Sequence, residues 1–255
     1  MKTLLLVGRG GNGKRTSADS INIPQINLDN LLFLPVVCSG VGDIGEDLEA
    51  PIESVVENVR KEIEKYEGDG GFDAISLVLK YGVRFTQQEK DAVEVVRSMF
   101  GENVLRDHGI IIMTYGDLFE VDNVNNKRTF KDWCMEQLGA MQTLLNEVEY
   151  RIVLLDNKTD NPVKRESQLN DLQRCLSLLN RKYRLEDFNK AEIKRTHLVV
   201  IHVHQRGCND EREPLIDRRA TIRPLRCYSR IEKCLTISLG LVIVGVIIYL
   251  IIRNA

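Results

Sequence analysis

Residues 4–16 have the sequence LLLVGRGGNGKRT, in which a short apolar run meets a glycine-rich turn. The run has the length of a buried strand, and the spacing from Gly8 to Gly13 and Lys14 matches the phosphate-binding loop in all but its last position. Glycines let consecutive backbone N–H groups converge on an anion, a following helix directs its positive end there, and a lysine reaches the outer phosphates. This stretch therefore predicts a strand, a loop and a helix that bind a nucleoside triphosphate.

Position 15 departs from this motif. The motif has Ser or Thr there, whose hydroxyl binds Mg²⁺, and this chain has Arg15. Thr16 does not replace it, because one step along a helix turns a side chain by about 100°. We therefore predict nucleotide binding and expect little magnesium-assisted hydrolysis. The competing interpretation is a strand-to-helix turn that binds nothing.

The composition argues against several classes of protein. The 35 Lys and Arg and the 37 Asp and Glu leave a formal net charge of −2, so a basic nucleic-acid-binding surface is not expected. The cysteines show no Cys-x-x-Cys spacing, which predicts neither a zinc cage nor a disulfide framework, and we assign no metal site. The length suits one sizeable domain with an appendage.

Apolar strands alternate with helices up to about residue 182. After the first strand, further strands are predicted near residues 31–37, 72–79, 110–113 and 152–155, and helices over 46–66, 86–100, 126–148 and 163–182. The alternation predicts a three-layer α/β domain with a mostly parallel sheet. The interval between Lys14 and the second strand is short, so the sheet is expected to lack an edge strand.

Two of these helices carry more specific expectations. Thr86 followed by Glu89 has the capping-box pattern at a helix start. The helix over 126–148 is expected to bury one face, which carries Phe130, Trp133, Leu138, Met141 and Leu145.

Two loops after predicted strands carry candidate binding residues. Gly40 can offer its N–H to the last phosphate, whereas Cys38 stands where a phosphate-sensing turn usually has a magnesium-binding aspartate. Residues 114–117 (TYGD) follow the strand 110–113, and Asp117 can accept two hydrogen bonds from N1 and N2 of guanine. Adenine does not present that pattern of donors.

Four stretches together resemble the GIMAP family of immunity-associated GTPases: the phosphate loop and residues 72–101, 114–117 and 151–168. The resemblance extends to about residue 180, and residues 80–86 (KYGVRFT) are its most specific part. It implies a three-layer P-loop G domain.

The resemblance also implies roles for single residues. By position, residues 8–14 would hold the phosphates, Asp117 would read guanine and Asn157 would line the base pocket. The residues assigned to the nucleotide are Gly8, Arg9, Gly10, Gly11, Asn12, Gly13, Lys14, Arg15, Thr16, Gly40, Tyr115, Asp117 and Asn157. The implied ligand is GTP or GDP, Mg²⁺ has weak support, and copies would assemble through the nucleotide face. The departures from the family pattern are Arg15, Cys38, the missing proline before Gly40 and a missing first switch, and no catalytic residue is assigned.

Residues 235–252 form an uncharged, apolar stretch. As a helix it would be about 27 Å long, close to the hydrocarbon thickness of a bilayer. Basic residues precede it, which favours keeping the large domain in the cytosol. The stretch predicts a single transmembrane helix that serves as a C-terminal anchor, in a membrane that the sequence does not identify.

We therefore divide the chain into a guanine-nucleotide-binding domain at residues 1–184, a basic juxtamembrane linker at 185–234 and the anchor at 235–252. The first hypothesis is a membrane-anchored guanine-nucleotide-binding protein with weak or no hydrolysis. The alternative is a nucleotide-free pseudo-GTPase that acts as a membrane scaffold or interaction protein. A third interpretation is that the short interval after Lys14 reflects a missing exon.

Overall fold

The computed structural model describes residues 1–22, 32–38, 41, 52–125 and 127–192. The chain divides into two units, Met1–Asp210 and Glu211–Ala255, and the second lies wholly outside the described residues. In chain order the elements are β1 (Lys2–Val7), α1 (Lys14–Ile21), β2 (Phe33–Val37), α2 (Ile52–Glu67), β3 (Ala74–Lys80), α3 (Gln87–Phe100), α4 (Val104–His108), β4 (Gly109–Thr114), α5 (Gly116–Asn123), α6 (Phe130–Met135), α7 (Gly139–Glu147), β5 (Ile152–Leu154), α8 (Pro162–Ser177) and α9 (Leu185–Lys190).

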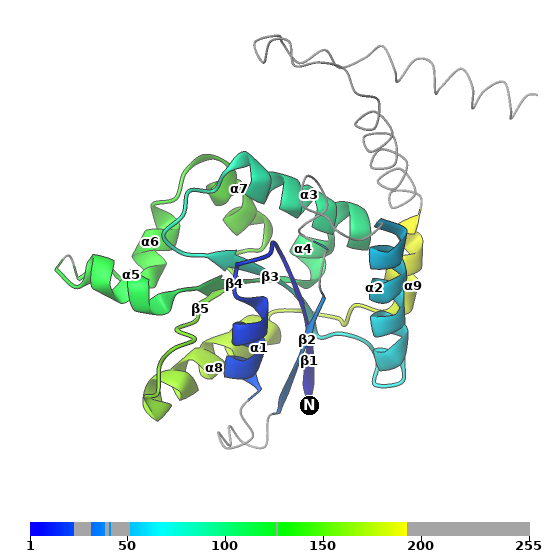
Figure 1. The fold of residues 1–255 in the computed structure, drawn as a ribbon, viewed down its shortest axis with the longest axis horizontal. Coiled ribbons are helices and arrows are strands. Elements are labelled where there is room, and N and C mark those ends of the chain that lie inside the picture. Colours follow the sequence, from blue (N-terminus) through cyan, green and yellow to red (C-terminus); the bar gives the residue numbers. More distant parts are fainter. Residues whose placement is uncertain (23–31, 39–40, 42–51, 126, 193–255) are drawn as a thin grey trace, which may run out of the picture. The chain divides into compact units, whose positions relative to one another are not determined.

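The described strands form one parallel sheet in the order β2-β1-β3-β4-β5 (Figure 1). Alternate side chains of a strand point to opposite faces. Leu5 therefore packs in the core that includes residues of α2, α3 and α7, whereas Leu4 packs in the core that includes residues of α1 and α8. Both faces are covered, and β4 is buried along its whole length, as expected of a parallel sheet. The predicted α/β fold with a parallel sheet is confirmed.

A proline lies on the open edge of β2. Lys2 N donates to Leu32 O at 2.7 Å and Cys38 N donates to Leu6 O at 2.9 Å, so the even-numbered residues of this strand bond to β1. Pro35 therefore faces away from β1, where its missing N–H leaves the edge without a donor. Within the described residues no strand pairs with this edge, and the missing edge strand stays a prediction because residues 23–31 lie outside them.

The continuous helix predicted over residues 126–148 is wrong. Two helices, α6 and α7, occupy this stretch, and Gly139 at the start of α7 has a left-handed φ of 61°. Met141 and Leu145 are buried as expected, and Phe130 and Trp133 are partly buried against the same core. Leu138 is 80% exposed, because it lies in the break between the helices.

The capping box predicted for Thr86 and Glu89 does not form. Thr86 is the N-cap residue of α3, but its side chain makes no capping hydrogen bond. Such a box is found instead at α6, where the hydroxyl of Thr129 accepts from Asp132 N at 3.1 Å. Glu89 is buried and turns toward the phosphate loop.

Helix α9 lies beyond the predicted domain boundary at residue 184. It packs against α2, and its Phe188 is fully buried. The folded domain therefore continues past residue 184, into the segment that we had assigned to the linker.

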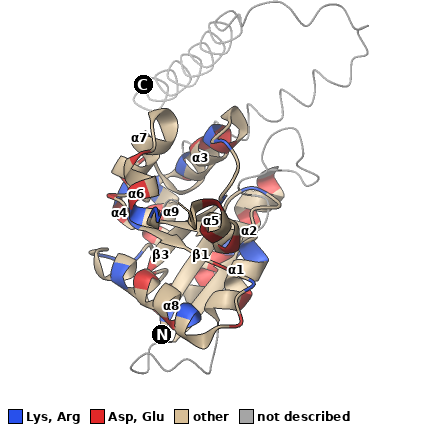
Figure 2. Ribbon diagram, turned by 90° about the vertical axis from the view of Figure 1, so that its left-hand side faces the viewer, with Lys and Arg blue, Asp and Glu red and all other residues tan. Residues whose placement is uncertain are grey.

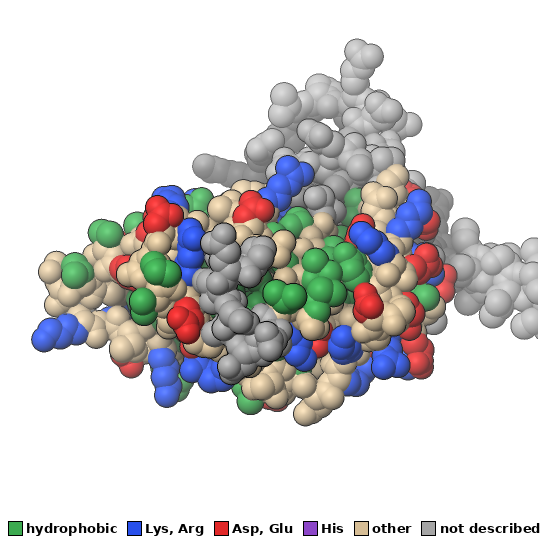
Figure 3. Space-filling model, turned by 90° about the horizontal axis from the view of Figure 1, so that it is seen from below, with side chains coloured by type: hydrophobic (Ala, Val, Ile, Leu, Met, Phe, Trp, Pro, Cys, Tyr) green, Lys and Arg blue, Asp and Glu red, His purple; other side chains and the backbone are tan. Residues whose placement is uncertain are grey.

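The described surface carries charges of both signs. Figure 2 shows basic and acidic residues spread over several helices. The face seen in Figure 3 is again mixed, with a patch of hydrophobic side chains among the charges. No helix within the described ranges has both the length and the apolar character needed to cross a bilayer, and the predicted anchor at 235–252 lies outside them.

Candidate nucleotide site

The phosphate loop is anchored to two central strands. Gly8 has a φ of 137°, and a Cβ atom there would lie 2.6 Å from the carbonyl oxygen of Val78 in β3, so only glycine fits this close approach. Asn12 Nδ2 donates to the same carbonyl oxygen at 3.0 Å, and Thr114 Oγ1 of β4 donates to Asn12 O at 3.0 Å. These bonds hold the loop over the carboxyl ends of β3 and β4, where ligands of open α/β sheets bind.

Lys14 is the last residue of this loop and the first of α1. The residue is 9% exposed, and its ammonium group donates to the carbonyl oxygens of Gly8 and Arg9, the latter at 2.9 Å. Within the described residues, the N–H groups of Gly11 and Gly13 donate no hydrogen bond. Helix α1 begins at Lys14, so its positive end points at the same place. Amides, an ammonium and a helix terminus together can bind a phosphate chain.

The described residues at this site do not fit a magnesium ion. Arg15 and Thr16 are exposed on α1, and Arg15 has no hydroxyl to offer. Burial, with a smaller contribution from Glu62, raises the pKa of the Cys38 thiol to about 12, so that the thiol stays protonated. A protonated soft sulfur is a poor ligand for Mg²⁺, which prefers oxygen. Gly40 lies outside the described residues.

The predicted guanine-reading residues follow β4 and β5. Lys158 Nζ donates to Asp117 Oδ2 at 2.8 Å, and this hydrogen bond lowers the pKa of Asp117 below its ordinary value. Asp117 is therefore an anion at neutral pH. Asn157 Nδ2 donates to Ser17 Oγ of α1 at 3.1 Å, while its buried Oδ1 has no partner among the described residues. A carboxylate and an amide oxygen are thus available to donors of a base.

Tyr115 lies close to two lysines. It has a left-handed φ of 65° and precedes α5. Lys80 Nζ lies 4.4 Å from its ring centroid and Lys158 Nζ lies 5.9 Å from it, both within the range of cation–π contacts. The ammonium group of Lys158 thus lies near both the Tyr115 ring and Asp117.

A sequence profile described as the AIG1 family matches residues 47–204, which is more than half of the chain. The chain belongs to the AIG1 family. The phosphate loop at residues 8–14 lies before the matched AIG1 segment.

Relatives from Arabidopsis thaliana support this assignment to the AIG1 family. Immune-associated nucleotide-binding protein 8 is 27% identical over 198 residues, which are 71% of this chain and 54% of that protein. Protein 9 of the same series is 28% identical over 192 residues, or 70% of this chain and 54% of that protein. Protein 1 is 29% identical over 183 residues, or 66% of this chain and 80% of that protein. The resemblance to GIMAP-type proteins is thereby confirmed, although the chain spans only about half the length of relatives such as proteins 8 and 9.

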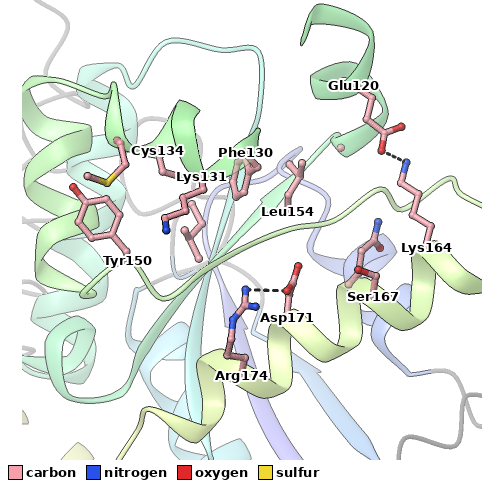
Figure 4. A pocket seen from close by; sticks show the side chains of 14 residues that line it. Glu120, Phe130, Lys131, Cys134, Tyr150, Leu154, Lys164, Ser167, Asp171 and Arg174 are labelled. Atoms are coloured by element: carbon pink, nitrogen blue, oxygen red, sulfur yellow. Dashed lines mark ion pairs between the residues drawn. The ribbon is translucent and has the colours of Figure 1, made fainter. Parts of the chain in front are cut away.

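A cavity of about 640 Å³ in this AIG1 domain lies away from the phosphate loop, along the free edge of β5 (Figure 4). Its floor is apolar, with Phe130 and Leu154, and ion pairs stand at its rim, between Glu120 and Lys164 at 2.6 Å and between Asp171 and Arg174 at 2.9 Å. None of residues 8–16 lines it. Lys164 also binds the buried Asp156 at 2.7 Å, one residue before Asn157, so the cavity adjoins the base loop without being part of it.

The AIG1 fold brings the predicted phosphate and base residues to one edge of the sheet. Gly13 lies beside Thr114 and Asn157, and Lys158 joins the second loop to Asp117. Sequence reasoning missed the roles of Thr114 and Lys158, each of which is adjacent to a residue that was assigned. It also missed Glu89, which was interpreted as part of a helix cap.

Proposed function

We propose that this AIG1-family protein binds GTP and GDP with weak or no hydrolysis, and that residues 235–252 anchor it in a membrane with its folded domain in the cytosol. One observation carries the nucleotide proposal: Lys14 is held against the carbonyl oxygens of Gly8 and Arg9, at the start of α1, in a loop tied to β3 and β4. Its relatives are named nucleotide-binding proteins, which supports the same proposal.

Selection of guanine follows from the charge on Asp117. Its carboxylate can accept from both N1 and N2 of guanine, whereas adenine would meet it with an acceptor at N1. In the nucleotide-bound protein Lys158 would give up or share its bond to Asp117. The aromatic ring of Tyr115, which lies within cation–π distance of Lys158, would pack near the base.

Weak hydrolysis follows from the poor fit to magnesium. Arg15 and the protonated Cys38 stand where the fold class usually supplies a hydroxyl and a carboxylate. Without a firmly held ion, the charge that develops on the phosphates would be met by Lys14 and the loop amides alone.

Two further parts of the proposal concern partners. Residues 235–252 are long and apolar enough for one membrane span, and basic residues precede them. We also propose that copies pair through the nucleotide face, because Leu118, Val121 and Val124 are exposed on and just after α5, next to Asp117.

Calorimetric titration of the whole chain in detergent tests the nucleotide proposal. We expect binding of GTP, GDP and a non-hydrolysable GTP analogue and none of ATP, with less than about a threefold change in Kd when Mg²⁺ is replaced by EDTA. Asp117→Ala should abolish the preference for GTP over ATP, since it removes the acceptor, while Asp122→Ala on the same helix should keep it.

The competing candidate is a nucleotide-free scaffold, and the altered residues Arg15 and Cys38 are the observation that favours it. No heat with any guanine nucleotide would decide for the scaffold. A strong dependence of affinity on Mg²⁺, together with turnover like that of ordinary GTPases, would contradict the weak-hydrolysis proposal.

A further inference from the structure

We propose that Glu89 is a positioning residue for the phosphate loop, which it holds through Arg9. The inference rests on the proposed nucleotide binding and assigns a role to a residue outside the loop. Glu89 is the third residue of α3, and Arg9 Nη1 lies 3.4 Å from Glu89 Oε1 although 80 residues separate the two in sequence. The pair therefore joins the loop after β1 to the helix that follows β3.

Burial makes this ion pair different from a surface one. The side chain of Glu89 is 7% exposed and that of Arg9 is 28% exposed. Surface pairs contribute little because water screens them, whereas a buried carboxylate must be compensated by a charged or hydrogen-bonding partner. In the described part of the chain, Arg9 is the residue that forms an ion pair with Glu89. The carboxylate thus constrains where the Arg9 side chain lies.

The constraint reaches the phosphate-binding group through the backbone. The carbonyl oxygen of Arg9 accepts from Lys14 Nζ at 2.9 Å, next to the bond from the same ammonium to Gly8 O. A chain of contacts therefore runs from the carboxylate of Glu89 to the side chain of Arg9, and from the backbone of Arg9 to Lys14. A shift of Arg9 would move the carbonyl group that orients the ammonium.

The second oxygen of Glu89 favours a functional role for this residue. Glu89 Oε2 is buried and has no hydrogen-bond partner among the described residues. Glu89 lines a cavity of about 40 Å³ beneath residues 81–85, which has room for a water molecule. A buried carboxylate with one oxygen unpaired by protein costs stability, and such costs are typical of functional positions.

Glu89→Gln in the 255-residue chain is the test, with Glu94→Gln as the matched control. Glu94 lies on the same helix, is exposed and pairs with Arg97. The neutral amide weakens the hold on Arg9, so we expect Kd for GTP and for GDP to rise about fivefold in Glu89→Gln and to stay unchanged in Glu94→Gln. Because glutamine keeps an oxygen that can accept from Arg9, and Arg9 is 28% exposed, the melting temperature without nucleotide should stay unchanged.

A double-mutant cycle separates this role from a general structural one. Arg9→Gln should weaken binding by a similar factor, and the Arg9→Gln/Glu89→Gln double variant should bind no more weakly than either single variant. Additive losses, unchanged affinity in Glu89→Gln, or a fall in its melting temperature that accompanies the loss of affinity would each overturn the role of Glu89. A wild-type chain that binds no GTP would instead overturn the proposed function, and the role with it.

Discussion

His108 is a buried histidine whose ring packs edge-on against Tyr183, with the centroids 5.3 Å apart. Burial, and then the nearby Arg181, lower the pKa of His108 below its ordinary value. In the unfolded chain a histidine titrates near pH 6.5. Below that pH the unfolded state binds a proton that the folded state resists, so stability is complete above about pH 6.5 and falls as the pH decreases toward the folded-state pKa.

We therefore expect the free energy of unfolding to drop between pH 7 and pH 5.5, with a slope of at most about 1.4 kcal/mol per pH unit from this residue. Denaturant unfolding at several pH values measures the slope. His108→Gln should flatten it, because glutamine does not titrate. An equal slope in the variant would show that other groups cause the effect.

At the scale of elements, the break between α6 and α7 depends on Gly139. Its φ of 61° is left-handed, and a Cβ atom there would meet nothing within 4 Å, so a side chain would cost backbone strain alone. Gly139→Ala should lower the free energy of unfolding by about 1–2 kcal/mol, and the melting temperature by roughly 2–4 °C per kcal/mol for a domain of this size.

Gly139→Asn is the matched control, because asparagine tolerates the left-handed region better than alanine. It should lose less stability than Gly139→Ala in the same denaturation experiment. If alanine were tolerated as well as glycine, the helices would not need this conformation, and the continuous helix over 126–148 would be accessible after all.

For the whole molecule, the decisive expectation is attachment to a membrane. Residues 235–252 should keep the expressed chain in the membrane pellet after an alkaline carbonate wash, and an arginine in the middle of a span costs about 2.5–3.5 kcal/mol on insertion scales. Val242→Arg together with Val246→Arg should therefore move the chain to the supernatant. Val242→Leu with Val246→Leu is the matched control and should stay in the pellet. Identical fractionation of the two double variants would contradict the proposed anchor.

The pattern of the chain was sufficient for the fold and for much of the candidate site. Strands β1, β3 and β4 are continuous apolar runs, and the glycine spacing before Lys14 predicts a loop followed by a helix. Such signals are local, because a strand or a loop is specified by neighbours in sequence. Asp117 is predicted from its turn after a parallel strand, because such strand ends meet at one edge of a sheet. Asn157 is assigned by the resemblance to the GIMAP family.

The sequence by itself determined the α/β alternation, the glycine spacing of the phosphate loop and the presence of Arg15 where the motif has Ser or Thr. Only the tertiary structure decided that Glu89 contacts Arg9 instead of capping its helix, that Lys158 pairs with Asp117, and that a helix breaks before Gly139. The physical reason is distance along the chain: periodicity and capping preferences report on adjacent residues, whereas a buried carboxylate takes the partner that packing brings to it.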